Sequence, residues 1–317
     1  MPAPIRRVVS IGECMVELAR GSDGRFGLAY GGDTFNTAVY LARAGIPVAY
    51  ATALGDDPYS SAIVDLARAE GIDTDLVAVV AGRNAGLYLI ETSAGGERSF
   101  HYWRDRAPVR DIFKSELGLV IAVAANDASL VYLSGITLSL YDEPGIEALE
   151  ALLKAARICG ARIAIDGNYR PRGWGGDSGR ARARTIFERF FRLADIALPT
   201  FEDEQMLWGD RTVDDTIARL QSFGIAEVAL KRGPQGALAI VDGRTLDVPV
   251  PAAVTPLDTT AAGDSFNAAY LAARLGGQPA EAAVVAGHRL AGVVIQHRGA
   301  IVSRAATDAV LASSYGK

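Results

Sequence analysis

The sequence predicts an α/β fold in which a mainly parallel central sheet carries helices on both faces and a small β-sheet projects as a lid. Short apolar runs bounded by glycine alternate with longer helical patterns along almost the whole chain. Some of these runs, such as residues 163–165, are apolar throughout, which is typical of parallel strands buried on both faces. Two segments, residues 13–30 and 85–105, instead alternate polar and apolar side chains, which favours hairpins.

The elements of the sheet can be placed in chain order. The runs predicted as strands are Val8–Ile11, Val48–Ala51, Leu130–Ser134, Ile163–Asp166, Ile196–Pro199 and Glu227–Lys231. The helical patterns between them are Thr34–Ala44, Tyr59–Glu70, Gly145–Ala156, Ala181–Ala194 and Val213–Phe223. Since the sequence shows no internal repeat, we expect a single domain over residues 1–317.

The two hairpins are predicted to form the lid. Turn residues interrupt each of them, with the sequence GSDG at 21–24 and SAGGE at 93–97. The hairpins contain too few apolar residues for a core of their own. We therefore expect them to project from the main sheet over a site.

Composition limits the class of protein. The chain has 317 residues, of which 50% are hydrophobic and 22% charged, as in an ordinary globular protein. The two cysteines, Cys14 and Cys159, are far apart and show no metal-binding spacing. The longest apolar run, residues 119–125, is too short to span a bilayer, and the N-terminus has no signal-peptide pattern. We expect a cytoplasmic protein without membrane contact.

The stretch Phe100–Arg110, FHYWRDRAPVR, interleaves aromatic and basic residues, which raises the possibility of a nucleic-acid surface. The whole chain is mildly acidic, however, with 32 Lys and Arg against 37 Asp and Glu. It lacks the positive charge that usually drives binding to a phosphate backbone. We therefore predict no nucleic-acid partner and interpret the stretch as a pocket for a small anion.

The segment Asp258–Gly277, DTTAAGDSFNAAYLAARLGG, carries the clearest chemical signal. Small residues at 261–263 allow a tight turn, and the N–H groups at the start of the following helix should converge as an anion hole. Asp264, in the first turn, is either a charge partner of the helix or a base that takes a proton from a hydroxyl group. In the second case the amides hold the charge of a transferred phosphoryl group. No GxxxxGK[ST] is present, so the segment is not a P-loop.

Two further glycine segments accompany this one. Tyr30–Gly45, YGGDTFNTAVYLARAG, opens a helix in which Asn36 offers an amide. Leu230–Ile240, LKRGPQGALAI, places Lys231 at a strand end, where a cation could serve a nucleotide phosphate. Each segment alone is also compatible with a turn that has no chemical role.

Together these segments resemble the PfkB, or ribokinase-like, family of carbohydrate kinases, whose DTxGAGD pattern corresponds to Asp258–Asp264. The resemblance implies a ribokinase-like three-layer α/β/α fold with a small β-sheet lid, and ATP and Mg²⁺ as donor and cofactor. It implies that Asp264 is the general base and that the anion hole at 261–264 is made by Ala261, Ala262 and Gly263. The nucleotide contacts that it implies are Lys231, Gly233, Gly236 and His288.

Three positions depart from the family pattern, and one of them is His288, which stands where many relatives carry an asparagine near the adenine. Phe201 stands where many members have an asparagine that supports the metal, so Glu204 is expected to act on Mg²⁺ through water. Ala261 replaces the first glycine of GAGD, and it permits the turn only if its φ is not positive.

The acceptor pocket is predicted from the lid. A strand over 99–106 puts His101, Trp103 and Asp105 on one face, and on the other Phe100, Tyr102, Arg104 and Arg106. A guanidinium group beside tyrosines suits a carboxylate, which neutral sugars lack. Arg170 lies just beyond the strand that ends at Asp166, where ligands of open α/β sheets gather.

These features resemble the 2-keto-3-deoxygluconate kinase branch, which phosphorylates the terminal (6-) hydroxyl of a sugar acid. The substrate contacts implied are Gly32, Asn36, Tyr88, Tyr102, Arg104 and Arg170. The alternatives are a fructokinase-like or other PfkB sugar kinase and, from a different class, an inert sugar-binding or regulatory relative. Exposed aromatic strands in the lid also predict a homo-oligomer formed through it.

Overall fold

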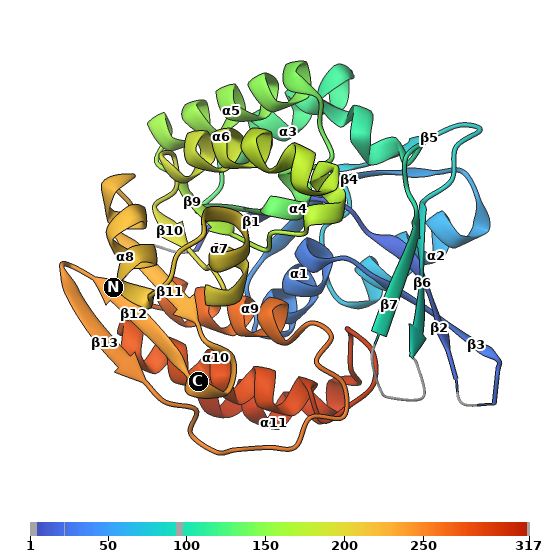
Figure 1. The fold of residues 1–317 in the computed structure, drawn as a ribbon. Coiled ribbons are helices and arrows are strands. Elements are labelled where there is room, and N and C mark those ends of the chain that lie inside the picture. The colour runs from blue at the N-terminus through green and yellow to red at the C-terminus, as the bar shows by residue number, and fades with distance from the viewer. Residues whose placement is uncertain (1–4, 22, 93–97, 316–317) are drawn as a thin grey trace.

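A nine-stranded sheet runs through the middle of the molecule in the computed structural model, which describes residues 5–21, 23–92 and 98–315 (Figure 1). Its strands follow the order β13-β12-β11-β10-β9-β8-β1-β4-β5. Every pairing from β5 to β11 is parallel, and β12 and β13 are antiparallel. The bounds are β1 Val8–Ile11, β4 Val48–Gly55, β5 Val77–Val80, β8 Leu130–Ser134, β9 Arg162–Asp166, β10 Ile196–Ala197, β11 Glu227–Lys231, β12 Ala237–Val241 and β13 Arg244–Val248.

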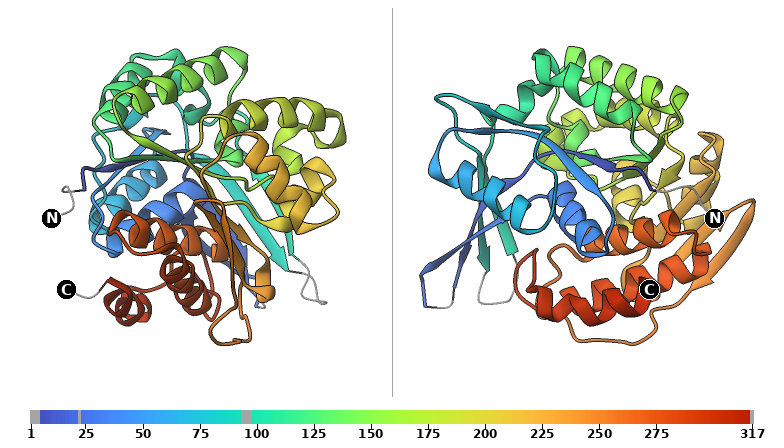
Figure 2. Two further views of the ribbon diagram at one scale, coloured as in Figure 1. Left: turned by 90° about the vertical axis from the view of Figure 1, so that its left-hand side faces the viewer. Right: turned by 180° about the vertical axis from the view of Figure 1, so that it is seen from behind.

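Helices cover both faces of this sheet, as the views in Figure 2 show. One layer holds α3 Glu116–Asn126, α4 Gly135–Leu138, α5 Glu143–Ile158, α6 Arg180–Phe191, α7 Phe201–Trp208 and α8 Val213–Ser222. The other holds α1 Asp33–Arg43, α2 Pro58–Ala69, α9 Ala262–Leu275, α10 Ala280–Val294 and α11 Arg304–Tyr315. The 3₁₀ helices are η1 Pro108–Lys114, η2 Pro171–Trp174, η3 Gly176–Gly179 and η4 Gly233–Gln235.

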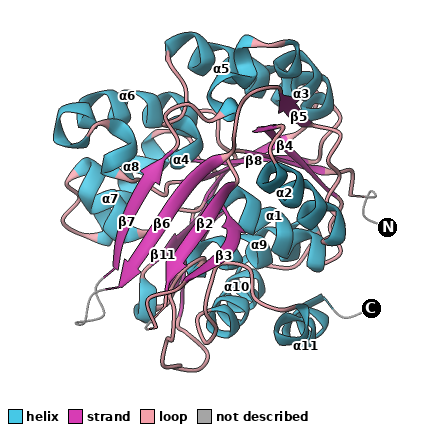
Figure 3. Cartoon of the chain, turned by 90° about the vertical axis from the view of Figure 1, so that its right-hand side faces the viewer, coloured by secondary structure: helices cyan, strands magenta, loops and turns pink. Residues whose placement is uncertain are grey.

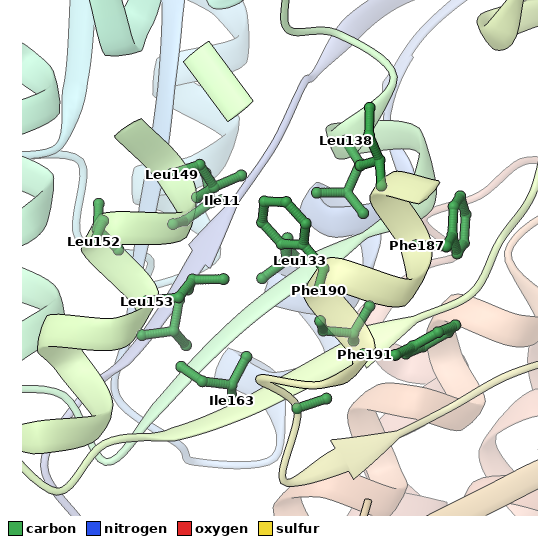
Figure 4. Close-up of a cluster of buried hydrophobic side chains, with 14 of the residues drawn as sticks. Ile11, Leu133, Leu138, Leu149, Leu152, Leu153, Ile163, Phe187, Phe190 and Phe191 are labelled. Carbon is green, nitrogen blue, oxygen red and sulfur yellow. The ribbon is translucent and has the colours of Figure 1, made fainter. Parts of the chain in front are cut away.

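The central strands are buried on both faces because their side chains alternate between two cores. In β9, Ile163 and Ile165 pack into one core and Ala164 into the other. Figure 4 shows part of the first core, where strand residues meet α5 and α6 through Ile11, Leu133, Ile163, Leu149, Leu153, Phe187 and Phe190. This packing fixes the strand ends at which the polar side chains of the site gather.

The lid is a separate four-stranded sheet, β3-β2-β6-β7, standing beside the main body (Figure 3). Its strands are β2 Met15–Arg20, β3 Phe26–Gly31, β6 Gly86–Thr92 and β7 Arg98–Trp103. The predicted hairpins β2–β3 and β6–β7 are both antiparallel, and β2 joins them by pairing in parallel with β6. The second predicted turn, residues 93–97, lies outside the described residues.

The structure confirms the predicted α/β fold with a small separate sheet, and it adds β5, β12 and β13 to the strands predicted for the main sheet. Strand β7 ends at Trp103 instead of continuing to residue 106, because the chain turns there and the Ala107 N–H donates to the Arg104 carbonyl at 3.1 Å. The apolar run 119–125 forms most of α3. None of the helices in the described ranges has the length and hydropathy needed to cross a bilayer.

Candidate active site

A cavity of about 530 Å³ opens where the carboxyl ends of the parallel strands meet the N-terminus of α9. Asp166 and Asn168 reach it from the end of β9, and Lys231 reaches it from the end of β11. Asp33 and Asp264 enter from the first turns of α1 and α9. We call this space the reaction cavity.

The N-terminus of α9 presents free backbone amides to the reaction cavity. The N–H groups of Ala261, Gly263 and Asp264 have no hydrogen-bond partner in the described part of the chain, and all three residues line the cavity. The Ala262 N–H instead donates to the Thr259 carbonyl at 3.2 Å. Because free amides and the helix dipole both favour negative charge, this turn can hold an anion.

Ala261 corrects one expectation from the sequence. Its φ is 59°, so it does adopt the left-handed conformation that a glycine would take more easily. For a residue with a Cβ this conformation costs roughly 1–2 kcal/mol. The surrounding packing therefore tolerates local strain at the turn that exposes the amides.

Asp264 is nearly buried, and within the described residues one hydrogen bond to its side chain orients it. Asn36 Nδ2 donates to its Oδ2 at 2.8 Å, while Thr37 Oγ1 donates to its backbone carbonyl at 3.2 Å. Burial and the neighbouring Asp33 carboxylate raise the pKa of Asp264 to about 8. A carboxyl group with a pKa near neutrality is suited to exchange a proton with a hydroxyl group.

Gly32 and Asn36 support the site from behind, and neither lines the reaction cavity. A Cβ on Gly32 would lie 1.9 Å from the Glu13 carbonyl oxygen, so only glycine allows the chain to pass there. Asn36 Oδ1 accepts the Gly32 N–H at 3.4 Å while its Nδ2 holds Asp264. The first turn of α1 thus positions the acidic group of α9.

Asp33 is a cavity residue that the sequence reasoning did not assign to the site. Its Oδ2 accepts from Asn168 Nδ2 at 2.8 Å, and burial raises its pKa. Asn168 has a φ of 36°, an uncommon conformation that aims its amide into the cavity. The signal in the sequence was an aspartate directly after the glycine turn, at the start of a helix.

Lys231 is held in a buried network at the end of β11. Its Nζ donates to Asp166 Oδ1 at 3.1 Å and to Asn267 Oδ1 at 2.8 Å. Asn267 Nδ2 in turn donates to Asp166 Oδ2 at 2.8 Å. A Cβ on Gly263 would be 3.7 Å from the Lys231 ammonium group, which therefore lies beside the free amides of α9.

A second cavity of about 610 Å³ continues from Lys231 and Gly263 and is mostly apolar. The predicted residues Gly233, Gly236 and His288 line it, together with Phe266, Val250, Val254 and Ile295. His288 packs edge-on against Phe266 with ring centroids 5.2 Å apart, and burial lowers its pKa, which favours the neutral ring. We call this space the apolar cavity, and it fits a flat ring system.

A third cavity of about 500 Å³ lies under the lid and shares Phe100, Ile136 and Arg170 with the reaction cavity. Four arginines line it, and we call it the arginine cavity: Arg104, Arg110, Arg170 and Arg172. Tyr102 lines it from β7, and burial raises the pKa of its hydroxyl group. The structure therefore brings the predicted Tyr102, Arg104 and Arg170 together.

The alternation predicted for the aromatic and basic stretch is confirmed up to the end of β7. Phe100, Tyr102 and Arg104 line the arginine cavity, while Trp103 lies on the other face of the lid with 60% of its surface exposed. The prediction was wrong for Asp105 and Arg106, because the chain turns after Trp103: Asp105 lines the arginine cavity, and Arg106 is exposed.

Tyr88 lies behind this surface. Its hydroxyl group donates to the Glu17 carboxylate, and its ring packs against Tyr102 with centroids 6.0 Å apart. Tyr88 lines neither the reaction cavity nor the arginine cavity. In the structure it supports Tyr102 from within the lid.

Glu204 is buried next to the site and does not line the three cavities. Its Oε2 accepts from Arg219 at 2.8 Å, its Oε1 has no hydrogen-bond partner among the residues described, and burial raises its pKa to about 7. The neighbouring Asp203, which the sequence reasoning did not single out, lines the reaction cavity. Phe201, at the position of the usual asparagine, packs against the hydrophobic core.

An α/β fold with an acid and free amides at a helix N-terminus, between an apolar and a cationic cavity, defines a small-molecule phosphotransferase. The model of the pfkB family carbohydrate kinases matches residues 5–307, and the chain belongs to this family. The family name describes carbohydrate kinases, and the match confirms the family that the sequence motifs predicted.

Individual proteins of known name are similar to nearly the whole chain. The 2-dehydro-3-deoxygluconokinase of Escherichia coli K12 is 42% identical over 313 residues, which cover 96% of this chain and 99% of that protein. The solved 2-dehydro-3-deoxygluconokinase of Thermotoga maritima has a TM-score of 0.81 at 22% identity and covers 98% of this chain and 99% of that chain. A ribokinase II of E. coli solved with ATP and Mg²⁺ has a TM-score of 0.82 at 22% identity, covering 93% and 94%. The ribokinase-like fold is confirmed.

Proposed function

We propose that the protein transfers a phosphoryl group from ATP to the terminal (6-) hydroxyl of 2-keto-3-deoxygluconate, also called 2-dehydro-3-deoxygluconate. The observation that carries the proposal is that the arginine cavity adjoins the reaction cavity, which Asp264 lines, because the two cavities share Phe100, Ile136 and Arg170. A short sugar acid has a carboxylate at one end and a hydroxyl group at the other, which matches this arrangement. The name of the 42% identical relative supports the same substrate.

Asp264 acts as the general base on the acceptor hydroxyl. Its carboxylate is held by Asn36 on one side and faces the reaction cavity on the other. The amides of Ala261, Gly263 and Asp264 offset the charge that develops on the transferred group, since preorganised donors act at no cost of reorganisation. Ala262 contributes by closing the turn through its bond to Thr259.

The apolar cavity fits the nucleotide. Val250, Val254 and Ile295 offer apolar contacts to a purine ring, and neutral His288 forms part of the same wall. Gly236 has a φ of 90°, and a Cβ there would lie 2.4 Å from the Val248 carbonyl oxygen, so this position requires glycine. Gly233 and Gly236 line the cavity with backbone atoms and no side chain. Lys231 lines both this cavity and the reaction cavity, where it would meet the phosphates.

The residues present also fit Mg²⁺, which neutralises charge on the phosphates of ATP when bound. Magnesium usually keeps several waters and takes one or two carboxylates together with substrate phosphates. Asp166 offers a carboxylate at the reaction cavity, and the unpaired Oε1 of Glu204 offers a second one through water. These two residues would hold the hydrated ion.

The rival functions make different demands on the site. A fructokinase or another kinase for neutral sugars has no use for a cavity lined by four arginines. An inert sugar-binding or regulatory relative has no need of an oriented Asp264 beside three free amides. Both features favour catalysis on an acidic acceptor.

A panel of acceptors tests the proposal. ADP release with ATP and Mg²⁺ is measured for 2-keto-3-deoxygluconate, its galactonate-derived epimer, fructose and ribose. We expect turnover with the keto acids and weak or no turnover with the neutral sugars. Robust turnover with fructose and none with either keto acid would overturn the proposed function.

We propose further that two copies associate through the outer face of the lid. This face exposes Phe26, Leu28 and Trp103 and borders a hollow of about 960 Å³. Exposed apolar patches of this kind commonly mark an interface between proteins. Light scattering on the wild type and on Trp103→Asp tests it, because the charged variant should shift towards the monomer while keeping its melting temperature.

A further inference from the structure

Arg110 faces the arginine cavity without a partner. It is half-buried, and within residues 5–21, 23–92 and 98–315 its side chain makes no hydrogen bond or ion pair. It belongs to η1, whose neighbouring residues Pro108, Val109 and Ile112 are buried and anchor the segment. A cation on a firmly packed base, aimed at a cavity, is available to a ligand.

The other three arginines of the cavity are already engaged. Arg104 pairs with Glu13 at 2.6 Å, and Arg170 pairs with Asp203 at 2.8 Å. Arg172 donates to the Phe100 carbonyl at 2.6 Å and lies over the Tyr102 ring. Arg110 therefore differs from them in having its full donor set free.

The charges of the arginine cavity do not balance. Four guanidinium groups line it against one lining carboxylate, that of Asp105, while Glu13 and Asp203 pair with Arg104 and Arg170 from outside the lining. An acceptor with a single carboxylate supplies the missing negative charge. A neutral sugar would leave the surplus charge uncompensated, and this difference produces discrimination against it.

Neighbouring acids do not neutralise Arg110. Asp111, the next residue, pairs instead with Arg83 at 3.4 Å and with Lys114 at 3.6 Å. Glu13 lies near enough that the charge of Arg110 acts on its pKa, which burial raises and Arg104 and Arg110 lower. Glu13 is nevertheless paired with Arg104, and Arg110 has no ion pair within the described residues.

We propose that Arg110 determines acceptor specificity by supplying the free guanidinium group that binds the carboxylate of the acceptor. The inference rests on the proposed function and deepens it, because it assigns the anionic end of the substrate to a residue outside β7. Arg104 and Arg170, each paired with one acid of the protein, line the same cavity and remain further contacts for the acceptor beside Arg110.

Steady-state kinetics with the keto acid test the assignment. Arg110→Ala is compared with Arg110→Lys, and Arg211→Ala serves as a control that removes an exposed arginine from the loop before α8. We expect Arg110→Ala to raise the acceptor KM about 10- to 100-fold, the usual worth of a hydrogen-bonded charge contact, while the ATP KM changes less than about twofold. Arg110→Lys keeps the charge and should raise the acceptor KM less. Arg211→Ala should match the wild type.

The same measurements separate the two possible failures. Calorimetric titration of each variant with the keto acid alone should show the same order of affinities, and circular dichroism confirms that the variants are folded. An acceptor KM within about twofold of wild type in Arg110→Ala would overturn the role of Arg110 and leave the proposed function standing. Equal losses in the Ala and Lys variants would also overturn it. A wild-type enzyme that releases no ADP with the keto acid would overturn both proposals.

Discussion

The reaction cavity and the arginine cavity adjoin each other and carry opposite charge. The first is lined by two cations, Lys231 and Arg170, and by four carboxylates, those of Asp33, Asp166, Asp203 and Asp264. Burial, and after it the neighbouring carboxylates, disfavour ionisation of Asp264 and raise its pKa. In the second, arginines outnumber the acids. The proposed function places proton transfer in the first cavity and anion binding in the second.

The two regions also differ in how they are built. The acids of the reaction cavity stand at strand ends and helix N-termini of the main sheet, where backbone packing fixes them. The arginine cavity is formed by long side chains from the lid, η1 and the loop after β9. The proposed function therefore assigns the chemistry to side chains held by the main sheet, and the choice of acceptor to side chains of the lid and loops.

Asp264→Asn should produce the largest effect, because it removes the base and keeps the shape of the reaction cavity. We expect kcat to fall by roughly 10²- to 10⁴-fold while the acceptor Kd stays within about twofold. ADP release and calorimetric titration measure the two quantities. Unchanged turnover would remove Asp264 from the mechanism.

The pH dependence should be the next largest effect. Only the Asp264 carboxylate accepts a proton, and its pKa is raised to about 8, so kcat/KM should fall as the pH drops below that value. At pH 6 about one enzyme molecule in a hundred would carry the ionised group. Asp33→Asn removes the neighbouring like charge, so the fall of kcat/KM on the acid side should move to lower pH. Asp65→Asn, on the exposed face of α2, should leave the pH profile unchanged. An unchanged pH profile in Asp33→Asn would contradict the conclusion that the Asp33 charge raises the pKa of Asp264.

Arg104→Ala tests the cationic side of the comparison. It should raise the acceptor KM about 10- to 100-fold and the ATP KM much less. The variant also leaves Glu13 buried without its ion pair, which lowers stability. Adding Glu13→Gln to Arg104→Ala removes the unpaired buried charge, so the double variant should regain the melting temperature of the wild type. Its acceptor KM should stay raised. Equal rises in both KM values would instead indicate a general defect of the lid.

His288→Ala should have the smallest effect, and it should change the KM for ATP only. The change removes a ring that packs on Phe266 in the wall of the apolar cavity. We expect the ATP KM to rise about three- to tenfold, the worth of one or two buried carbon groups, with the acceptor KM unchanged. The exposed His297 provides the matched control, His297→Ala. An effect on the acceptor KM alone would place His288 outside the nucleotide site.

The fold was largely predictable because the sheet strands carry unambiguous local signals. The apolar run at β9 and the amphipathic pattern of α5 reflect burial that each element imposes on its own sequence. The end of β7 was not predictable in the same way, since the turn after Trp103 depends on the chain docking through Ala107 and η1.

The sequence by itself determined the sheet and its helices, the lid, and the turn at 261–264 with its acid, because each depends on a local pattern of residues. The tertiary structure decided which side chains meet. It joined Asn36 to Asp264 across the fold, took Tyr88 and Glu204 into internal bonds, and left Arg110 free. Such pairings depend on distances between elements far apart in the chain, which no local pattern records. The periodicity of the sequence can assign a side chain to one face of an element, but only the packing of the elements decides whether it meets a hydrogen-bond or ion-pair partner.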